Sequence, residues 1–277
     1  MTGNPGGESV PAVPPAVWET YGPADLSAVP VFSGGFINFG YWASVDLTDP
    51  LSEGDRIRSE QDLYRQVLDA AAPGGGRAVE VGCGLGVGCA LALEEYRPEA
   101  VTGVDIHPQQ LERARGANAA LLAAAPDRLR FVLGAAEGLP LGDGEFDCLY
   151  SVEAAQHFPD LSAFAREAAR VLRPGGRVAV ASFFTVDGAP GHAGRLAGLL
   201  DSFASGLDIA RPVSRLTGAL TDSGLVDVRA RSIGAQVWPG WDRWLSRLWE
   251  PGTWPRNFLT AWEQRILDYY LVTATRP

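Results

Sequence analysis

The chain has 277 residues, of which 46% are hydrophobic and 20% are charged, the balance of a globular protein large enough to bury a core. Its formal net charge is −10 and no run of Lys or Arg occurs, which argues against nucleic acids and anionic membrane surfaces as partners. Three cysteines without metal-ligand spacing, no signal-peptide pattern and no apolar stretch of membrane-spanning length predict a reduced protein of the cytoplasm.

Residues 1–16 are rich in Gly, Pro and Ser and are predicted to be a disordered tail, followed by a single domain over residues 17–277. Residues 17–58 carry aromatic side chains among glycines, most densely in FSGGFINFGYW from Phe32 to Trp42. Aromatic residues in a glycine-rich loop pack either onto the core or onto a ligand. We interpret residues 17–58 as an N-terminal lid segment.

A helix is predicted from an N-capping Ser59 to Ala71, because apolar residues recur there at helical spacing. Five short β-rich runs then alternate with helical stretches, at residues 78–82, 101–106, 129–134, 146–152 and 177–183, the last preceded by a tight RPGG turn. This alternation predicts an α/β fold with a parallel sheet and helices on both faces. A helix over 215–224, a strand over 226–233, a Trp-rich cap insert over 235–263 and a final strand over 267–276 complete the chain.

The first strand leads into a glycine loop, V-E-V-G-C-G-L-G-V-G, over residues 79–88. Gly82, Gly84 and Gly86 allow a sharp turn and a close approach of the backbone to a ligand. Asp105 ends the next strand, where a carboxylate can accept hydrogen bonds from ribose hydroxyls. These residues predict a nucleoside site and leave its identity open, although NAD sites favour G-x-G-x-x-G over alternate glycines.

The motifs EVGCGLG, GVDIHPQQLERA, GAAEGLPLGDGEFDCLYSVEAAQHF and VLRPGGRVAVASF, in this order, resemble those of class I S-adenosylmethionine (SAM)-dependent methyltransferases over about residues 60–185. GGFINFGYW and SVEAAQHF resemble the bacterial secondary-metabolite subgroup, which includes O-methyltransferases of macrolide sugars. The resemblance implies a Rossmann-like, mostly parallel sheet of seven strands, the last antiparallel. It also implies SAM as cofactor, S-adenosylhomocysteine (SAH) as product, and no metal.

The resemblance further implies which residues bind the ligands. The expected cofactor contacts are Tyr41, Glu80, Gly82, Cys83, Gly84, Gly86, Asp105, Ile106, Gln110, Ala136, Glu137 and Ser151. The expected acceptor contacts are Trp42, Glu153, His157 and Trp238. Many relatives carry Asp where this chain has Ala135, so the contact to the adenine amino group is either missing or supplied by Glu137.

His157 is the candidate catalytic base, because it follows the fourth strand at the sheet edge where ligands bind, and the matching His is the proposed base in relatives. The alternative is a histidine that only lines the cleft or caps a helix. Some relatives pair this His with an Asp after the fifth strand. Ser182 stands there in this chain, which weakens the prediction of an acid-oriented His.

The cap insert carries Trp238, Trp241, Trp244, Trp249 and Trp254, five of the eight tryptophans of the chain. Their spacing favours either a pocket for a hydrophobic acceptor or a contact in a homo-oligomer. The predicted activity is methylation of a hydroxyl on a small molecule such as a polyketide or a glycoside. The alternatives are a C- or N-methyltransferase, a SAM-bound cyclase, a non-catalytic SAM-binding protein and an NAD-dependent oxidoreductase.

Overall fold

The computed structural model describes residues 15–23, 25–188 and 191–277. Most of the predicted disordered tail, residues 1–14, lies outside this described part. Its last two residues do not belong to a tail, because helix α1 spans Pro15–Tyr21 and begins at a proline, whose fixed φ suits a first helical turn.

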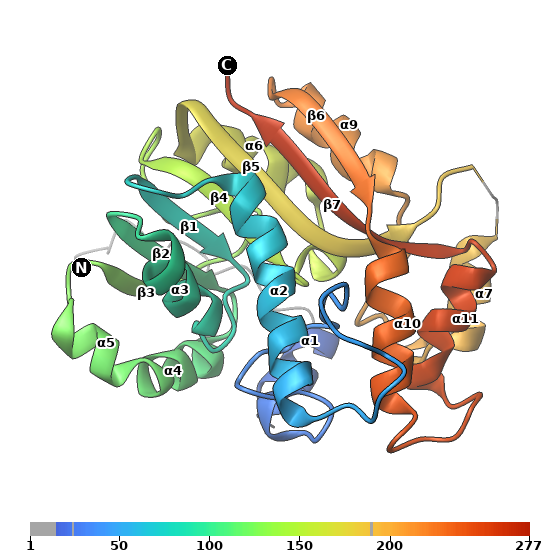
Figure 1. Cartoon of the computed structure of the whole chain (residues 1–277). Coiled ribbons are helices and arrows are strands. Elements are labelled where there is room, and N and C mark those ends of the chain that lie inside the picture. The colour runs from blue at the N-terminus through green and yellow to red at the C-terminus, as the bar shows by residue number, and fades with distance from the viewer. Residues whose placement is uncertain (1–14, 24, 189–190) are drawn as a thin grey trace, which may run out of the picture.

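Seven strands form one mixed sheet in the order β3-β2-β1-β4-β5-β7-β6 (Figure 1). Strands β1 to β5 pair in parallel, and β7 runs antiparallel to both of its neighbours, as the resemblance implied for the last strand. The strands are β1 Arg77–Val81, β2 Ala100–Asp105, β3 Leu129–Leu133, β4 Phe146–Val152, β5 Leu172–Thr185, β6 Val226–Ser232 and β7 Leu267–Thr275.

Helices cover both faces of the sheet and bury two separate cores. Side chains of the central strands alternate between the two: Cys148 and Tyr150 of β4 belong to the core under α2 and α10, and Leu149 belongs to the core under α6 and α9. The remaining helices of four or more residues are α2 Glu53–Ala71, α3 Val87–Leu91, α4 Pro108–Ala117, α5 Ala119–Ala124, α6 Leu161–Val171, α7 His192–Leu199, α8 Asp201–Ala204, α9 Val213–Asp222, α10 Gly234–Leu245 and α11 Asn257–Glu263, together with a π-helical turn at Ala92–Tyr96.

Two predicted boundaries differ from the structure. Helix α2 begins at Glu53, and its N-cap is Ser52 and not Ser59, because Ser52 and Asp55 form a capping box that satisfies free N–H groups about two turns earlier. Strand β5 begins at Leu172, so the predicted RPGG turn lies inside it as an irregularity where the pairing with β4 shifts register.

A buried arginine fixes the N-terminal lid segment onto α2. The Arg56 guanidinium is fully buried, donates from Nε to the carbonyl oxygen of Val31 at 3.0 Å and forms an ion pair with Glu60 at 2.9 Å. It also donates to the carbonyl oxygen of Asn38 and lies 5.1 Å from the ring centroid of Trp241 on α10. The segment is therefore tied to two helices, which sets the position of the residues that it contributes to the site.

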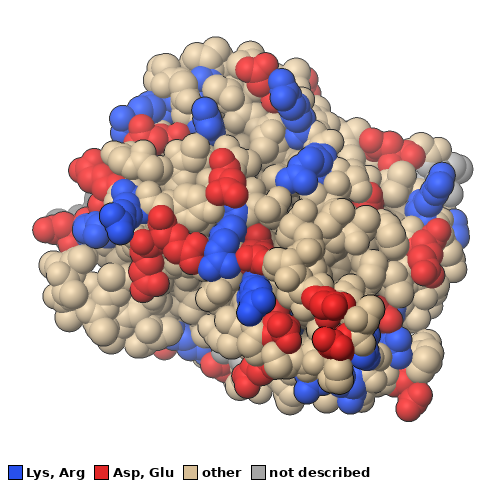
Figure 2. Space-filling model, in the orientation of Figure 1, with Lys and Arg blue, Asp and Glu red and all other residues tan. Residues whose placement is uncertain are grey.

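Within the described residues, no helix is long and apolar enough to cross a membrane. On the face drawn in Figure 2, cationic and anionic side chains are interspersed, and the described residues form no extended basic patch there.

Candidate active site

The glycine loop turns at the carboxyl edge of the sheet, between β1 and α3. The N–H groups of Gly82 and Cys83 both donate to the carbonyl oxygen of Val104 on β2, and the three alternate glycines have φ of 79°, 51° and 68°. A Cβ at Gly82 would lie 2.3 Å from Ala154, whereas a Cβ at Gly84 would meet no atom within 4 Å. Gly82 is therefore required by packing, and Gly84 faces open space that a ligand can use.

Asp105 lies opposite this loop. Its carboxylate accepts hydrogen bonds from the N–H of Gly84 at 2.9 Å and of His107 at 2.8 Å, which uses about half of its acceptor positions. Burial raises the pKa of Asp105, although both backbone N–H groups act against this rise. The remaining acceptor positions can bind a pair of ligand hydroxyls.

A cavity opens over the loop and Asp105, and we call it the glycine-loop cavity. Eight of the predicted cofactor residues line it: Gly82, Cys83, Gly84, Asp105, Ile106, Gln110, Ala136 and Glu137. Burial raises the pKa of Glu137, whose carboxylate accepts from the N–H of Asp160 at 3.4 Å. On the opposite wall lie residues of the N-terminal lid segment, among them Tyr21 and Ile37.

A second cavity of about 650 Å³ lies beside the first, and we call it the aromatic cavity. Its walls are mostly apolar and aromatic, and include Phe39, Phe183, Trp241, Trp249 and Phe258. A volume of several hundred cubic ångströms and such walls are typical of small-molecule sites. Three of the five tryptophans of the cap insert line this cavity, Trp241, Trp249 and Trp254, which agrees with the interpretation of the insert as a pocket wall.

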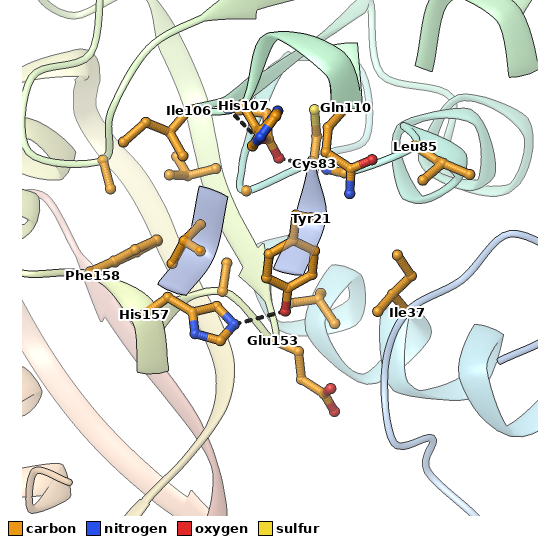
Figure 3. A pocket seen from close by; sticks show the side chains of 18 of the residues that line it. Tyr21, Ile37, Cys83, Leu85, Ile106, His107, Gln110, Glu153, His157 and Phe158 are labelled. Carbon is orange, nitrogen blue, oxygen red and sulfur yellow. Dashed lines mark hydrogen bonds between the residues drawn. The ribbon is translucent and has the colours of Figure 1, made fainter. Parts of the chain in front are cut away.

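Four residues line both cavities: Tyr21, Ile37, Glu153 and His157. Figure 3 shows Tyr21 and His157 facing each other at this junction, with Glu153 and Ile37 nearby. A ligand in one cavity and a ligand in the other would therefore meet at these side chains.

The imidazole of His157 has one hydrogen-bond acceptor and one nearby carboxylate on its Nδ1 side. Its Nδ1 lies 2.8 Å from the carbonyl oxygen of Leu207 and 3.3 Å from a carboxylate oxygen of Asp208. A carbonyl oxygen only accepts, so Nδ1 carries a proton, and Nε2 on the junction side accepts from the Tyr21 hydroxyl at 2.9 Å and the side-chain nitrogen of Gln156 at 3.1 Å. A carboxylate thus lies beside Nδ1 even though Ser182 stands where some relatives have Asp; the Ser182 hydroxyl donates to Gln156 at 2.6 Å.

Glu153 is held in a strained position at the same junction, with φ at 47°. One carboxyl oxygen accepts from the N–H of Phe39 at 2.7 Å and from the hydroxyl of Tyr269 at 2.8 Å. Burial raises the pKa of Glu153 to about 8. The residue therefore ties the lid segment to β7 and presents a carboxyl group to both cavities.

Tyr41 and Trp42, predicted to contact the cofactor and the acceptor, line neither cavity. The N–H of Tyr41 donates to the carbonyl oxygen of Ser59, and Trp42 is buried against Gly240, where a Cβ would lie 2.0 Å from its ring. Both residues staple the lid segment onto α2 and α10.

Four further predicted contacts lie beneath the cavity walls and not in them. Trp238 is fully buried in the core, and Glu80 accepts hydrogen bonds from the Tyr64 hydroxyl and the Cys89 thiol. Gly86 makes room for the ring of Phe131, 2.4 Å from where its Cβ would lie. The Ser151 hydroxyl donates to the carbonyl oxygen of Val81 at 2.7 Å and joins β4 to β1. These four residues therefore support the cavity walls from behind and do not line them.

The structure also adds residues that the motifs did not single out, Tyr21 and Asp208 above all. No local pattern marks either of them, because Tyr21 and His157 are 136 positions apart and meet only through the fold.

The residues fit a nucleoside cofactor: a glycine faces open space, a buried carboxylate keeps free acceptor positions, and His107 has a buried Nε2 without a hydrogen-bond partner. No group of three His, Cys, Asp or Glu in the described ranges is arranged to hold a metal ion. Fold and site together define a Rossmann-like enzyme that binds a nucleoside cofactor next to an apolar acceptor cavity.

Comparisons with known proteins give the family. The model of the methyltransferase domain matches residues 79–180. The chain is 33% identical to erythromycin 3''-O-methyltransferase of Saccharopolyspora erythraea, over 78% of this chain and 70% of that protein. It is 31% identical to a methyltransferase of Streptomyces halstedii, over 87% of each. The chain belongs to the class I SAM-dependent methyltransferases, and the resemblance to members of bacterial secondary metabolism is confirmed.

Solved structures agree on the fold. The geranyl diphosphate C-methyltransferase of Streptomyces coelicolor, crystallised with Mg²⁺, geranyl diphosphate and SAH, superposes with a TM-score of 0.74 at 18% identity, over 87% of this chain and 91% of that chain. With the family given by the curated relatives, the protein is a SAM-dependent enzyme of methyl transfer, and the alternative of an NAD-dependent oxidoreductase is set aside.

Proposed function

We propose that the enzyme methylates a hydroxyl of a small and largely apolar natural product, such as a polyketide or a glycoside, and that His157 takes the hydroxyl proton. The observation that carries this proposal is the imidazole of His157 at the junction of the two cavities, with Nδ1 directed at the carbonyl oxygen of Leu207 and the carboxylate of Asp208, and with Nε2 on the junction side as the acceptor nitrogen.

Bound SAM supplies a methyl group on a sulfonium, whose thioether leaves without needing a proton. In the proposal, Asp105 accepts hydrogen bonds from the ribose hydroxyls, the backbone of Gly82 to Gly84 borders the methionine part, and Glu137 lies by the adenine. An aliphatic hydroxyl is a weak nucleophile, so a base that accepts its proton contributes typically about 10²–10⁴-fold. Walls around the junction also align the acceptor oxygen and exclude water.

The charges around the aromatic cavity support a neutral acceptor. Among the described residues, its walls contain Glu153, Asp201 and Asp208 but no Arg or Lys. A carboxylate or diphosphate there would lie near carboxyl groups with no cation to offset its charge. An uncharged alcohol avoids this cost. The relative named for O-methylation of erythromycin supports the same type of acceptor atom.

The test is incubation of the protein with SAM and a panel of hydroxylated polyketides and glycosides, read by product mass. We expect His157→Ala to lower kcat by about 10²–10⁴-fold with SAH affinity unchanged. His192→Ala is the matched control, because His192 lines neither cavity. Wild-type turnover in His157→Ala would overturn the assignment of the base. Methylation found at carbon or nitrogen by NMR of the product would establish the C- or N-methyltransferase alternative.

A further inference from the structure

The N-terminal helix α1 brings a phenol to the lone pair of the candidate base. The hydroxyl of Tyr21 lies 2.9 Å from Nε2 of His157, and the dashed line in Figure 3 marks this contact. Since Nδ1 of His157 faces the carbonyl oxygen of Leu207, Nε2 is the acceptor. It accepts from the Tyr21 hydroxyl and, at the longer distance of 3.1 Å, from the side-chain amide nitrogen of Gln156. An acceptor hydroxyl therefore either displaces Tyr21 or reaches His157 through it.

The anchoring of α1 favours a Tyr21 that stays in place. Arg113 on α4 donates to the carbonyl oxygens of Tyr21 at 2.8 Å and of Gly22 at 2.7 Å. Also on α1, the ring of Trp18 stacks on His107 with the ring centroids 4.4 Å apart. Two hydrogen bonds and a ring contact thus bind the helix to the wall of the glycine-loop cavity.

Tyr21 is also placed to touch the acceptor. It lines the aromatic cavity as well as the glycine-loop cavity, and its hydroxyl is only partly buried, so the side chain borders the space where the acceptor would lie. A phenol that donates its hydrogen to Nε2 keeps lone pairs on oxygen that can accept from another hydroxyl.

We propose that Tyr21 is a catalytic residue that relays the acceptor proton to His157, an inference that rests on the proposed O-methylation. As the acceptor oxygen bonds to the methyl carbon, the electron pair of the broken carbon–sulfur bond stays on sulfur. The acceptor proton moves to the Tyr21 oxygen while the proton of Tyr21 moves to Nε2. The imidazolium that forms is stabilised by Leu207 and Asp208, and no other reactant is needed.

The test compares Tyr21→Phe, which removes only the hydroxyl, with wild type and with Tyr96→Phe. Tyr96 is a matched control because its hydroxyl donates to Asp69 at 2.7 Å and the residue lines neither cavity. We expect Tyr21→Phe to lower kcat by about 10–10²-fold, at the lower end of the range for acid–base groups, with KM of the acceptor and SAH affinity unchanged. The dependence of the single-turnover rate on the fraction of D₂O should be curved in wild type and linear in Tyr21→Phe, because the variant lacks one of the two protons that move in the relay.

A second readout does not depend on turnover. The ¹⁵N resonance of His157 Nε2 should shift in Tyr21→Phe and stay in place in Tyr96→Phe. Wild-type kcat with a lower acceptor KM in Tyr21→Phe would overturn the relay, because Tyr21 would then only occupy the acceptor position. Loss of SAH affinity would overturn it as well, in favour of a lid role. If His157→Ala loses turnover and Tyr21→Phe does not, the relay through Tyr21 is refuted while the assignment of His157 as the base stands. If neither variant loses turnover, the assignment of His157 is refuted as well.

Discussion

Substitution of Asp105 tests how the glycine loop and β2 hold the cofactor. The Asp105 carboxylate accepts from two backbone N–H groups, at 2.9 Å and 2.8 Å, and keeps acceptor positions that we assign to two ribose hydroxyls. Hydrogen bonds to a charged group contribute about 1.5–3 kcal/mol each, so two of them sum to roughly 3–6 kcal/mol. Because 1.4 kcal/mol corresponds to a factor of about ten, Asp105→Ala should weaken SAH binding by roughly 10²–10⁴-fold.

Titration calorimetry with SAH measures this change directly. Asp105→Asn keeps one acceptor oxygen without charge and should fall between wild type and Asp105→Ala. Asp147→Ala is the matched control, since Asp147 also accepts from a backbone N–H, that of Arg77 at 2.6 Å, but lines neither cavity. Unchanged SAH affinity in folded Asp105→Ala would refute the assignment of the ribose site.

Gly84 gives an independent test of the same site. A Cβ at this position meets no protein atom within 4 Å, so Gly84→Val removes ligand space while sparing the packing. Its φ of 51° adds backbone strain for a β-branched residue. SAH affinity should fall further than in Asp105→Ala, and full affinity would mean that the ligand does not approach the loop.

Two predictions concern pH and metal ions. Burial raises the pKa of Glu153 from 4.5 to about 8, so the folded state keeps a proton that the unfolded state has lost between these values. The free energy of unfolding should therefore fall as pH rises through this window, by at most about 1.4 kcal/mol per pH unit for this group. When this free energy is measured by urea unfolding, its slope against pH should be smaller for Glu153→Gln than for wild type. An equal slope would contradict the burial of this carboxyl group. Turnover should persist in EDTA, because the described residues offer no metal-binding group and the thioether leaves without a Lewis acid; loss of activity that Mg²⁺ restores would refute this.

The parts of the molecule that the sequence determined are those whose residues are neighbours along the chain. The glycine loop directly follows β1, and Asp105 ends β2. Because these two strands are parallel, the loop and Asp105 lie at the same edge of the sheet. The alternation of apolar runs predicted all seven strands to within a few residues at most boundaries. The start of α2 was misjudged because Ser52 and Ser59 are both possible caps, each followed three residues later by an Asp, and only the structure shows that the capping box forms at Ser52.

In the N-terminal lid segment, the local sequence pattern does not determine where the aromatic side chains lie. Aromatic residues in a glycine-rich stretch fit a core and a ligand equally, and the placement of Trp42 depends on Gly240, almost 200 positions away. Which aromatic side chains reach a cavity and which reach the core is decided by the helix that packs against them. Sequence spacing carries no information on that choice.

The junction of the two cavities was decided by tertiary structure alone. His157 was predicted from its place after β4, but its partners Tyr21 and Asp208 come from α1 and from the segment after α8, 136 and 51 positions away. Hydrogen bonds of this kind need an approach of about 3 Å between groups on separate elements. That approach is set by how α1 docks on α4 and how the chain returns after β5, and both depend on contacts spread over the whole domain.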